Sequence, residues 1–230
     1  MGAWTALRTL VVFAFLAVVT FSIAKMPRFQ LMGPLVYRAN TSAKCVALTF
    51  DDGPSPPHTQ EVFSVLDRHG AKATFFVIGQ NIERHPGIAR EIHRRGHKLA
   101  NHSYTHQPMV LRSPSSLREE ITRTDYLIRK SGQTGEIHFR PPHGLKLIAL
   151  PKVLSELNKT TVTWDITPQD YRRSAPEWTA DYVLSRIQPG SIVLLHDKTP
   201  EIARATDLIL STLEKLGFRA VTVSTLMSHC

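Results

Sequence analysis

Past residue 44 the chain alternates between short apolar runs and longer amphipathic segments, and this alternation restricts the fold more than any other feature of the sequence. The apolar runs, which predict strands, are residues 46–50, 72–78, 98–101, 137–140, 161–166, 191–196 and 219–223. The amphipathic segments, which predict helices, are residues 59–69, 86–95, 116–130, 150–157, 176–187 and 201–216. Strands that alternate with helices form parallel βαβ units, whose right-handed crossovers place the helices outside. We therefore expect an α/β domain over residues 45–230, a seven-stranded (β/α) barrel, with a doubly wound open sheet as the competing architecture.

The first 24 residues form a separate segment. Residues 9–24 are an almost unbroken apolar run with basic residues on both sides. The run is shorter than the ~20 residues of a membrane span, and Ser22-Ile23-Ala24 resembles a small-residue cleavage site. We expect a signal peptide or an uncleaved signal anchor at residues 1–24, with a buried core helix as the remaining alternative. Residues 25–44 then form a linker. The domain would lie outside the cytoplasm, as a secreted, periplasmic or cell-surface protein, held on the membrane if the segment is uncleaved.

The overall charge and the cysteines restrict the partners and the compartment less strongly. The formal net charge of +9 favours anionic surroundings such as phospholipid head groups, an acidic envelope polymer or nucleic acid. Lys and Arg do not cluster with aromatic residues as a nucleic-acid surface requires, so we predict no nucleic-acid partner, and we predict no protein partner. Export would permit a disulfide between the two cysteines, Cys45 and Cys230, but the sequence leaves this pairing open.

The first predicted strand ends at two adjacent carboxylates, Asp51 and Asp52, followed by Gly53-Pro54. Side chains alternate across a strand, so the two carboxylates point in different directions. That geometry suits a division of labour in which one carboxylate binds a metal and the other lies near a water molecule. The alternative is an ordinary turn, since Asp, Gly and Pro are common there for backbone reasons.

Polar and titratable residues also follow four further predicted strands. They are His102 to His106, Arg140 to Gly144, the Asp165, Asp170 and Tyr171 group, and Leu194 to Asp197. In a barrel of parallel strands the chemistry lies at the carboxyl ends of the strands, where all these residues fall. His102 and His106 are spaced i, i+4, which on a helical turn would place both imidazoles on one face. With one aspartate they would make a set of two His and one carboxylate with an open position, as catalytic zinc requires.

Five segments in order resemble the motifs of the polysaccharide deacetylases, the NodB-like domain of carbohydrate esterase family 4. They are Thr49-Phe50-Asp51-Asp52-Gly53, His102-Ser103-Tyr104-Thr105-His106, Arg140-Pro141-Pro142-His143-Gly144, Asp170-Tyr171 and Leu194-Leu195-His196. The resemblance covers residues 44 to 227. It implies a distorted seven-stranded barrel and a divalent metal, zinc first and cobalt as an alternative, held by Asp52, His102 and His106. It also implies removal of N-acetyl groups from a glycan that contains N-acetylglucosamine, such as peptidoglycan or a chitin-like polymer.

The resemblance also implies a role for each remaining site residue. Asp51 is the general base and Arg140 keeps it ionised and oriented, while His196 is the general acid and Asp170 keeps it charged. The implied substrate contacts are a backbone N–H near Tyr104, an acetyl pocket at Tyr171 and Leu194, and a sugar contact at His143. His143 replaces the family's usual aromatic residue and Tyr171 its usual Trp, so both substitutions bear on substrate preference rather than on the metal.

Three other functions are compatible with parts of this pattern. A metal-dependent hydrolase could act on another amide or on an acetate ester. A non-catalytic glycan-binding relic would not need the full set of catalytic and metal-binding residues, which is present here. A basic nucleic-acid binder would show steep salt dependence. The sequence does not specify the glycan, the metal, the oligomeric state or cleavage of the N-terminal segment.

Overall fold

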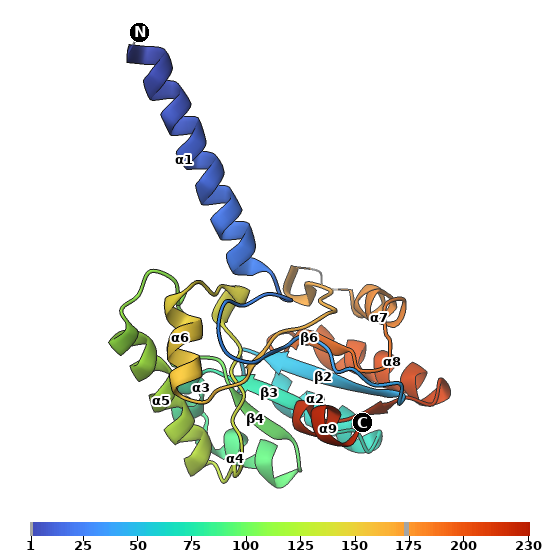
Figure 1. The fold of residues 1–230 in the computed structure, drawn as a ribbon. Helices are drawn as coiled ribbons and strands as arrows, with labels where there is room; N and C mark the ends of the chain where they lie inside the picture. The colour runs from blue at the N-terminus through green and yellow to red at the C-terminus, as the bar shows by residue number, and fades with distance from the viewer. Residues whose placement is uncertain (1, 173–174) are drawn as a thin grey trace.

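The computed structural model describes residues 2–172 and 175–230, which form one α/β domain with a helix projecting from it (Figure 1). The strands are β1 (Leu35–Val36), β2 (Cys45–Asp51), β3 (Thr74–Val77), β4 (Lys98–Asn101), β5 (Thr161–Val162), β6 (Ile192–His196) and β7 (Arg219–Ala220). The α-helices are α1 (Gly2–Lys25), α2 (His58–Arg68), α3 (Gly79–Arg84), α4 (Pro86–Arg94), α5 (Pro114–Lys130), α6 (Ala149–Glu156), α7 (Pro176–Leu184), α8 (Glu201–Lys215) and α9 (Val223–His229). Two 3₁₀ turns, η1 (Pro142–Gly144) and η2 (Asp170–Arg172), follow predicted strand ends.

The parallel strand pairings follow a closed path. One ladder runs β4-β3-β2-β6, β7 pairs with the start of β2, and β1 pairs with β5. Isolated bridges join the two groups: Phe139 pairs with both Asn101 and Thr161, and Ile166 pairs with Val193. The α/β class is confirmed, and the closed path is what a distorted barrel requires.

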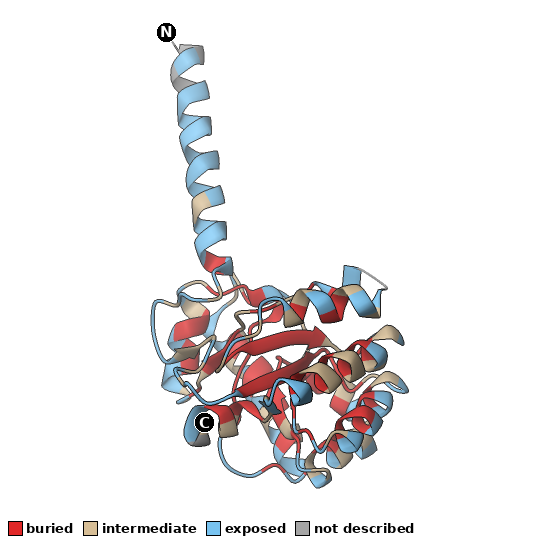
Figure 2. Ribbon diagram, turned by 90° about the vertical axis from the view of Figure 1, so that its right-hand side faces the viewer, coloured by how far each residue is buried: buried red, intermediate tan, exposed pale blue. Residues whose placement is uncertain are grey.

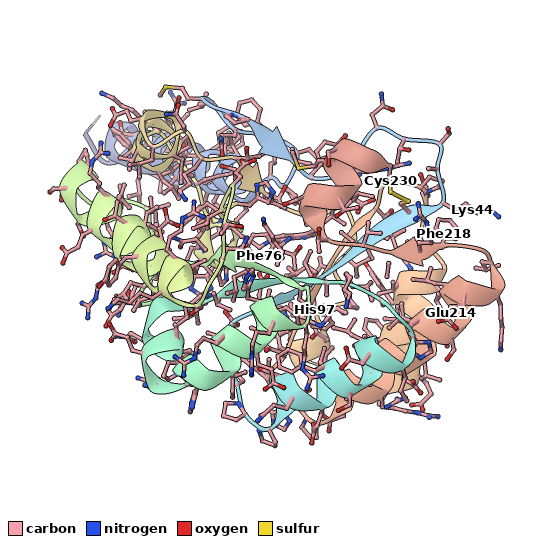
Figure 3. The ribbon with its side chains drawn as sticks, turned by 90° about the horizontal axis from the view of Figure 1, so that it is seen from below. Lys44, Phe76, His97, Glu214, Phe218 and Cys230 are labelled. Atoms are coloured by element: carbon pink, nitrogen blue, oxygen red, sulfur yellow. A yellow bond between two sulfur atoms is a disulfide. The ribbon has the colours of Figure 1, made fainter. Side chains whose placement is uncertain are left out.

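The two faces of β2 explain how the barrel positions its polar residues. All seven residues of β2 are buried. Val46, Leu48 and Phe50 pack outward in the main core cluster, which contains residues of α2 and α8. Cys45 and Ala47 face the opposite way and pack in a second cluster with Ala100, Val162 and Phe76, the last of which is labelled in Figure 3. Because side chains alternate along a strand, Asp51 points to the same inner side as Cys45 and Ala47.

Several of the predicted assignments differ from the structure, and the strands predicted at residues 161–166 and 219–223 shorten to β5 and β7. The predicted strand at residues 137–140 is reduced to single bridges at Phe139, because the prolines at positions 141 and 142 cannot donate ladder hydrogen bonds. The structure also contains β1, which lies in the predicted linker 25–44 and pairs with β5. Thr161 N donates to Pro34 O and Thr163 N to Val36 O, so this part of the segment belongs to the domain.

Cys45 and Cys230 are joined by a disulfide, which the sequence left open. The bond ties the C-terminal residue after α9 to the first residue of β2, and Cys230 is labelled in Figure 3. The two cysteines are separated by 185 positions, so this bond closes nearly the whole α/β domain into a loop.

Helix α1 stands away from the domain. Its residues are almost all exposed up to the last turn, where Ala24 becomes buried (Figure 2). Residues 7–25 have a mean hydropathy of 2.2 and are long and apolar enough to cross a membrane, a test that a signal sequence also passes. The exposure of α1 rules out the interpretation of this segment as a buried core helix. A signal peptide and a membrane anchor are both compatible with the structure.

Candidate active site

A cavity of about 620 Å³ opens where the predicted strand-end residues meet. Eight of the eleven predicted site residues line it: Asp51, Asp52, His102, His106, His143, Tyr171, Leu194 and His196. Its volume lies in the range of small-molecule binding sites. Arg140 and Asp170 lie behind this wall, where each contacts a lining residue, and Tyr104 lies elsewhere.

Asp52 leaves β2 with a positive φ of 76° and points toward the two predicted histidine ligands. Asp52 Oδ1 lies 3.0 Å from His106 Nε2 and 3.5 Å from His102 Nε2. The two Nε2 atoms are 3.2 Å apart. The three predicted metal ligands are therefore brought together, with one donor atom of each within 4.8 Å of the others.

The His102 imidazole is oriented by a backbone carbonyl. His102 Nδ1 lies 2.8 Å from Arg140 O and donates to it, so Nε2 is the unprotonated nitrogen that faces Asp52. Burial lowers the pKa of His102 to about 4. A neutral imidazole with its lone pair toward the site is the form that binds a metal.

His106 reaches this position from a loop rather than from a helical turn, so the helical placement expected from the i, i+4 spacing is wrong. Residues 102–106 have no helical assignment, and Ser103 and His106 both have positive φ. Within the loop, Ser103 Oγ accepts from His106 N. The spacing correctly indicated that the two imidazoles lie together, but they are brought together by a loop with two positive φ angles and not by a helix.

Glu120 of α5 stabilises the loop of residues 102–106 through hydrogen bonds. Its carboxylate accepts hydrogen bonds from Tyr104 N and Thr105 N, both at 2.9 Å, and from Thr105 Oγ1 at 2.8 Å. Glu120 is buried, so these interactions are shielded from water. Sequence analysis did not identify Glu120, because nothing in its spacing relates it to the histidines.

The donor set fits a divalent metal. Asp52 Oδ1 is buried and has no hydrogen-bond partner among the described residues, although two imidazole nitrogens lie close to it. Burial would raise the pKa of the Asp52 carboxyl, but the imidazoles of His106 and His102 and the ammonium of Lys198 hold it below its usual range. Two nitrogen donors and one carboxylate oxygen, with no fourth protein ligand in this group, match the ligand set of catalytic zinc sites.

Asp51 is locked in place by Arg140. Arg140 Nη1 donates to Asp51 Oδ1 at 2.6 Å and to Thr49 Oγ1 at 2.8 Å, and Nε and Nη2 donate to the carbonyls of Val162 and Thr163. The guanidinium is fully buried and lies over the Phe76 ring.

The second oxygen of Asp51 faces the cavity. Asp51 Oδ2, which Arg140 does not bind, is 3.6 Å from His102 Nε2 and lines the cavity. Asp51 is therefore a rigid carboxylate beside the metal-ligand group.

His196 and Asp170 form a second pair of ionisable groups beside the cavity. His196 is the last residue of β6, paired with Asp51 in the β2–β6 register. Its Nδ1 lies 2.9 Å from Asp170 Oδ1, and its backbone N donates to Asp170 Oδ2. Burial would lower the pKa of His196, but the hydrogen bond and charge of Asp170, with further charges of Asp51 and Asp52, raise it above the usual value. An imidazole with a raised pKa is suited to donate a proton from Nε2.

The remaining wall is apolar and aromatic. Leu194 lies two residues before His196 on the same face of β6, and the Tyr171 ring packs edge-on against His196 with 4.9 Å between centroids. His143, in η1, packs against His106 at 4.8 Å. His143 is exposed, but it lines the rim of the cavity and is not an isolated surface histidine.

Tyr104 does not occupy the place that the family resemblance implies. Its backbone N–H donates to Glu120, so it is not free to bind a substrate oxygen. The Tyr104 hydroxyl donates to Glu83, and Arg123 stacks over the ring, on the far side of the loop. The structure thus places Tyr104 among the residues that support the metal-ligand loop.

The cavity also contains residues that the sequence did not indicate. Lys198 Nζ pairs with Asp52 Oδ2 at 2.8 Å, two positions after His196. Trp164 also lines the cavity, close to Gly144. Lys25, the last residue of α1, also lines the cavity. Lys198 and Trp164 lie next to predicted strand ends, which is a usable signal, whereas Lys25 is more than a hundred residues from most of the site.

The chain is similar to known proteins over most of its length. A family model described as polysaccharide deacetylase matches residues 38–162. The chitooligosaccharide deacetylase of Sinorhizobium fredii is 35% identical over 166 residues, which cover 72% of this chain and 77% of the relative. A peptidoglycan-N-acetylglucosamine deacetylase of Bacillus cereus is 32% identical over 202 residues, which cover 86% of this chain and 94% of the relative.

The fold is also similar to solved structures. One is BA3943 of Bacillus anthracis, described as a pseudoenzyme of carbohydrate esterase family 4. It matches with a TM-score of 0.79 and 26% identity, over 85% of this chain and 69% of that one. The likeness supports the fold, and because this neighbour is a pseudoenzyme, activity has to be argued from the site residues.

Proposed function

The chain belongs to the polysaccharide deacetylase family, carbohydrate esterase family 4, and on that premise we propose that it is a metal-dependent hydrolase of N-acetylated glycans. The substrate would be an oligomer or polymer containing N-acetylglucosamine, since the relatives are named for chitooligosaccharide and for peptidoglycan. The products would be acetate and a free amine on the sugar.

One observation carries this proposal. The Asp51–Arg140 pair and the His196–Asp170 pair both adjoin the Asp52, His102 and His106 group within one cavity. Amide hydrolysis needs a base for the water and an acid for the leaving nitrogen, and the two pairs supply one of each. A glycan-binding relic would have no use for either pair.

Asp52, His102 and His106 would hold the metal, with zinc as the first candidate and cobalt as an alternative. When bound, the metal would act as a Lewis acid toward the acetyl carbonyl. The chain's own part here is to keep the ligands in their binding forms, through the Arg140 carbonyl that orients His102 and through Glu120, which holds the loop that carries His106.

The proton transfers follow from the two pairs. Asp51 accepts a proton from the attacking water through Oδ2, while Arg140 binds Oδ1 and orients the carboxylate. His196 donates the Nε2 proton to the sugar nitrogen as the C–N bond breaks and the new C–O bond completes the acetate. Asp170 stabilises the protonated imidazole and fixes its tautomer.

The substrate contacts would lie on the wall and rim. Leu194 and Tyr171 would pack against the acetyl methyl group, and His143 would contact the sugar ring. A histidine and a tyrosine at these positions offer smaller and more polar surfaces than the family's usual residues, which suits a hydrated sugar.

We further infer that the domain works outside the cytoplasm. The disulfide between Cys45 and Cys230 supports this, because disulfides persist in oxidising compartments. The apolar α1 supports it as well, since export and anchoring both begin with such a segment.

The proposal is tested by acetate release from N-acetylglucosamine oligomers and from N-acetylated peptidoglycan. We expect release that is abolished by a chelator and restored by zinc or cobalt. Full activity of protein shown to be metal-free would contradict the metal-dependent mechanism. Release only from acetate esters would favour the rival esterase, and no release from any substrate by metal-loaded protein would favour the relic.

A further inference from the structure

The base of α1 forms part of the cavity wall. Lys25, the last residue of α1, lines the cavity together with His143 and Asp52. The last turn of α1 contacts η1, which carries His143. The helix therefore ends at the mouth of the candidate active site.

The junction between α1 and the domain is held by hydrogen bonds rather than by a flexible linker. Lys146 N donates to Ala24 O at 3.0 Å, and Lys146 Nζ donates to Met26 O at 2.7 Å. Thr163 Oγ1 donates to Pro27 O at 2.6 Å. Lys146 and Ala24 are both buried at this point. Cleavage after Ala24 would divide this bonded junction, so the geometry favours a helix that stays attached.

Helix α1 has the properties of a membrane span. The segment Leu7–Lys25 is 19 residues long, has a mean hydropathy of 2.2, and is 6% buried within the structure. A helix of about 20 apolar residues matches the hydrocarbon core of a bilayer. Lys25 would then lie at the level of the lipid head groups, where basic side chains are favoured.

The surface around the base of α1 is also suited to lipid. Met26, Phe29, Leu31 and Met32 follow the helix directly, and they are exposed by 47%, 43%, 56% and 39%. Arg28 lies among them in the sequence. Exposed apolar side chains interspersed with basic ones are typical of segments that lie in a membrane interface. This observation does not depend on the hydropathy of α1 itself.

Together these features place the mouth of the cavity at the membrane surface. We propose that α1 remains attached as an anchor and that the substrate is an N-acetylated amino sugar joined through phosphate to a lipid of the same membrane. Lys25 and Arg172, which both line the cavity, would attract the phosphate of such a substrate. The reaction is the hydrolysis proposed above, so this inference rests on it: acetate leaves to water, and the amine product stays on the lipid.

The test uses the full-length protein reconstituted in phospholipid vesicles. The lipid-linked probe is N-acetylglucosaminyl-pyrophosphoryl-undecaprenol, and the soluble probe is the N-acetylglucosamine tetramer. We expect acetate release from the lipid-linked probe when enzyme and probe share a vesicle, and at least about tenfold less when they are in separate vesicles. Equal release in both arrangements, or no release from the lipid-linked probe, would overturn the inference. Activity on the tetramer reports on the proposed function separately.

A spacer variant sharpens the test. Ten Gly and Ser residues inserted between Lys25 and Met26 would break the junction while leaving the cavity's acid–base pairs in place. We expect release from the lipid-linked probe to fall about tenfold and release from the tetramer to persist, which also shows that the variant is folded. The matched control carries the same ten residues ahead of α1 and should behave as the unmodified protein. An unchanged spacer variant, or membrane-isolated protein whose intact mass lacks residues 1–24, would contradict the proposal.

Discussion

The floor and the rim of the cavity are built in different ways. The floor consists of Asp51 and His102, with Arg140 directly behind them; all three are buried, and each is fixed by hydrogen bonds to strand-end backbone or to one another. The rim consists of Lys25, His143 and Tyr171, which lie in a helix end and two 3₁₀ turns and make ring or charge contacts instead. Tyr171 is 51% exposed. Groups that must hold a proton or a ligand are thus placed by the barrel, whereas groups that meet the substrate are placed on loops that can vary without disturbing it.

The largest difference between floor and rim is expected in the free energy of unfolding, when an arginine of each region is replaced by methionine. Arg140→Met leaves the Asp51 carboxylate buried without its partner, and breaking a buried pair costs about 3–5 kcal/mol of unfolding free energy. Arg172→Met, at the exposed rim, should cost at most about 0.5 kcal/mol. Urea unfolding of both variants measures the difference. Equal destabilisation would show that the Arg140 network is not what stabilises the floor.

The acid pair should show its effect in the pH–rate profile. His196→Ala removes the general acid, so kcat should fall by about 10²- to 10⁴-fold with metal content unchanged, and the alkaline limb should flatten. Asp170→Asn keeps the imidazole but removes the charge that raises its pKa. Since the protonated form is active, a lower pKa moves the alkaline limb to lower pH. A limb that stays in place in both variants would assign the acid to another group.

The support of the metal-ligand loop should show a smaller effect. Glu120→Gln weakens the acceptor for Tyr104 N and Thr105 N, and loss of such supporting contacts lowers metal affinity by about 10- to 100-fold. The neighbouring Glu119 is exposed, so Glu119→Gln is the matched control and should bind metal as the unmodified protein does. Competition with a chromogenic chelator measures both affinities. Similar affinities for the two variants would remove Glu120 from the account.

The smallest effect is expected at the rim. His143→Ala removes a ring that packs against His106. Single aromatic contacts contribute about 0.5–1.5 kcal/mol, which corresponds to about two- to tenfold in affinity. We expect this change in KM for N-acetylglucosamine oligomers, with kcat nearly unchanged. A loss of kcat comparable to that of His196→Ala would move His143 from the rim to the reacting groups.

The floor was largely predictable from the sequence because it lies at strand ends. The apolar run up to Phe50 identified β2, and the period of two along that strand separated Asp51 from Asp52. Residues 137–140 show the limit of this reasoning: an apolar run ending in Arg140 reads as a strand, but the two prolines that follow leave only single bridges at Phe139. The predicted place of Arg140 beside Asp51 survived this error, since it depends on the two bridges at Phe139 and not on a full ladder.

Other parts of the site depend on contacts that no local pattern contains. Glu120, a buried residue of α5, binds the loop that carries His106, and Tyr104 does not line the cavity because Glu120 accepts its N–H. Residues 25–44 read as a linker, since a two-residue strand such as β1 has too few positions to show a period. The contribution of Lys25 to the cavity follows only from how the base of α1 packs against η1.

The central claim is that two adjacent aspartates have different functions, and the metal content of two purified variants tests it most directly. Asp51 is bound by Arg140 on the inner side of β2, whereas Asp52 turns toward the two histidines with a positive φ. We predict that Asp51→Asn retains bound zinc and loses most of its turnover, because an amide cannot accept the water's proton. Asp52→Asn should be purified with little zinc and recover part of its activity in excess zinc. Metal-free Asp51→Asn beside fully loaded Asp52→Asn would contradict the account and reverse the assignment.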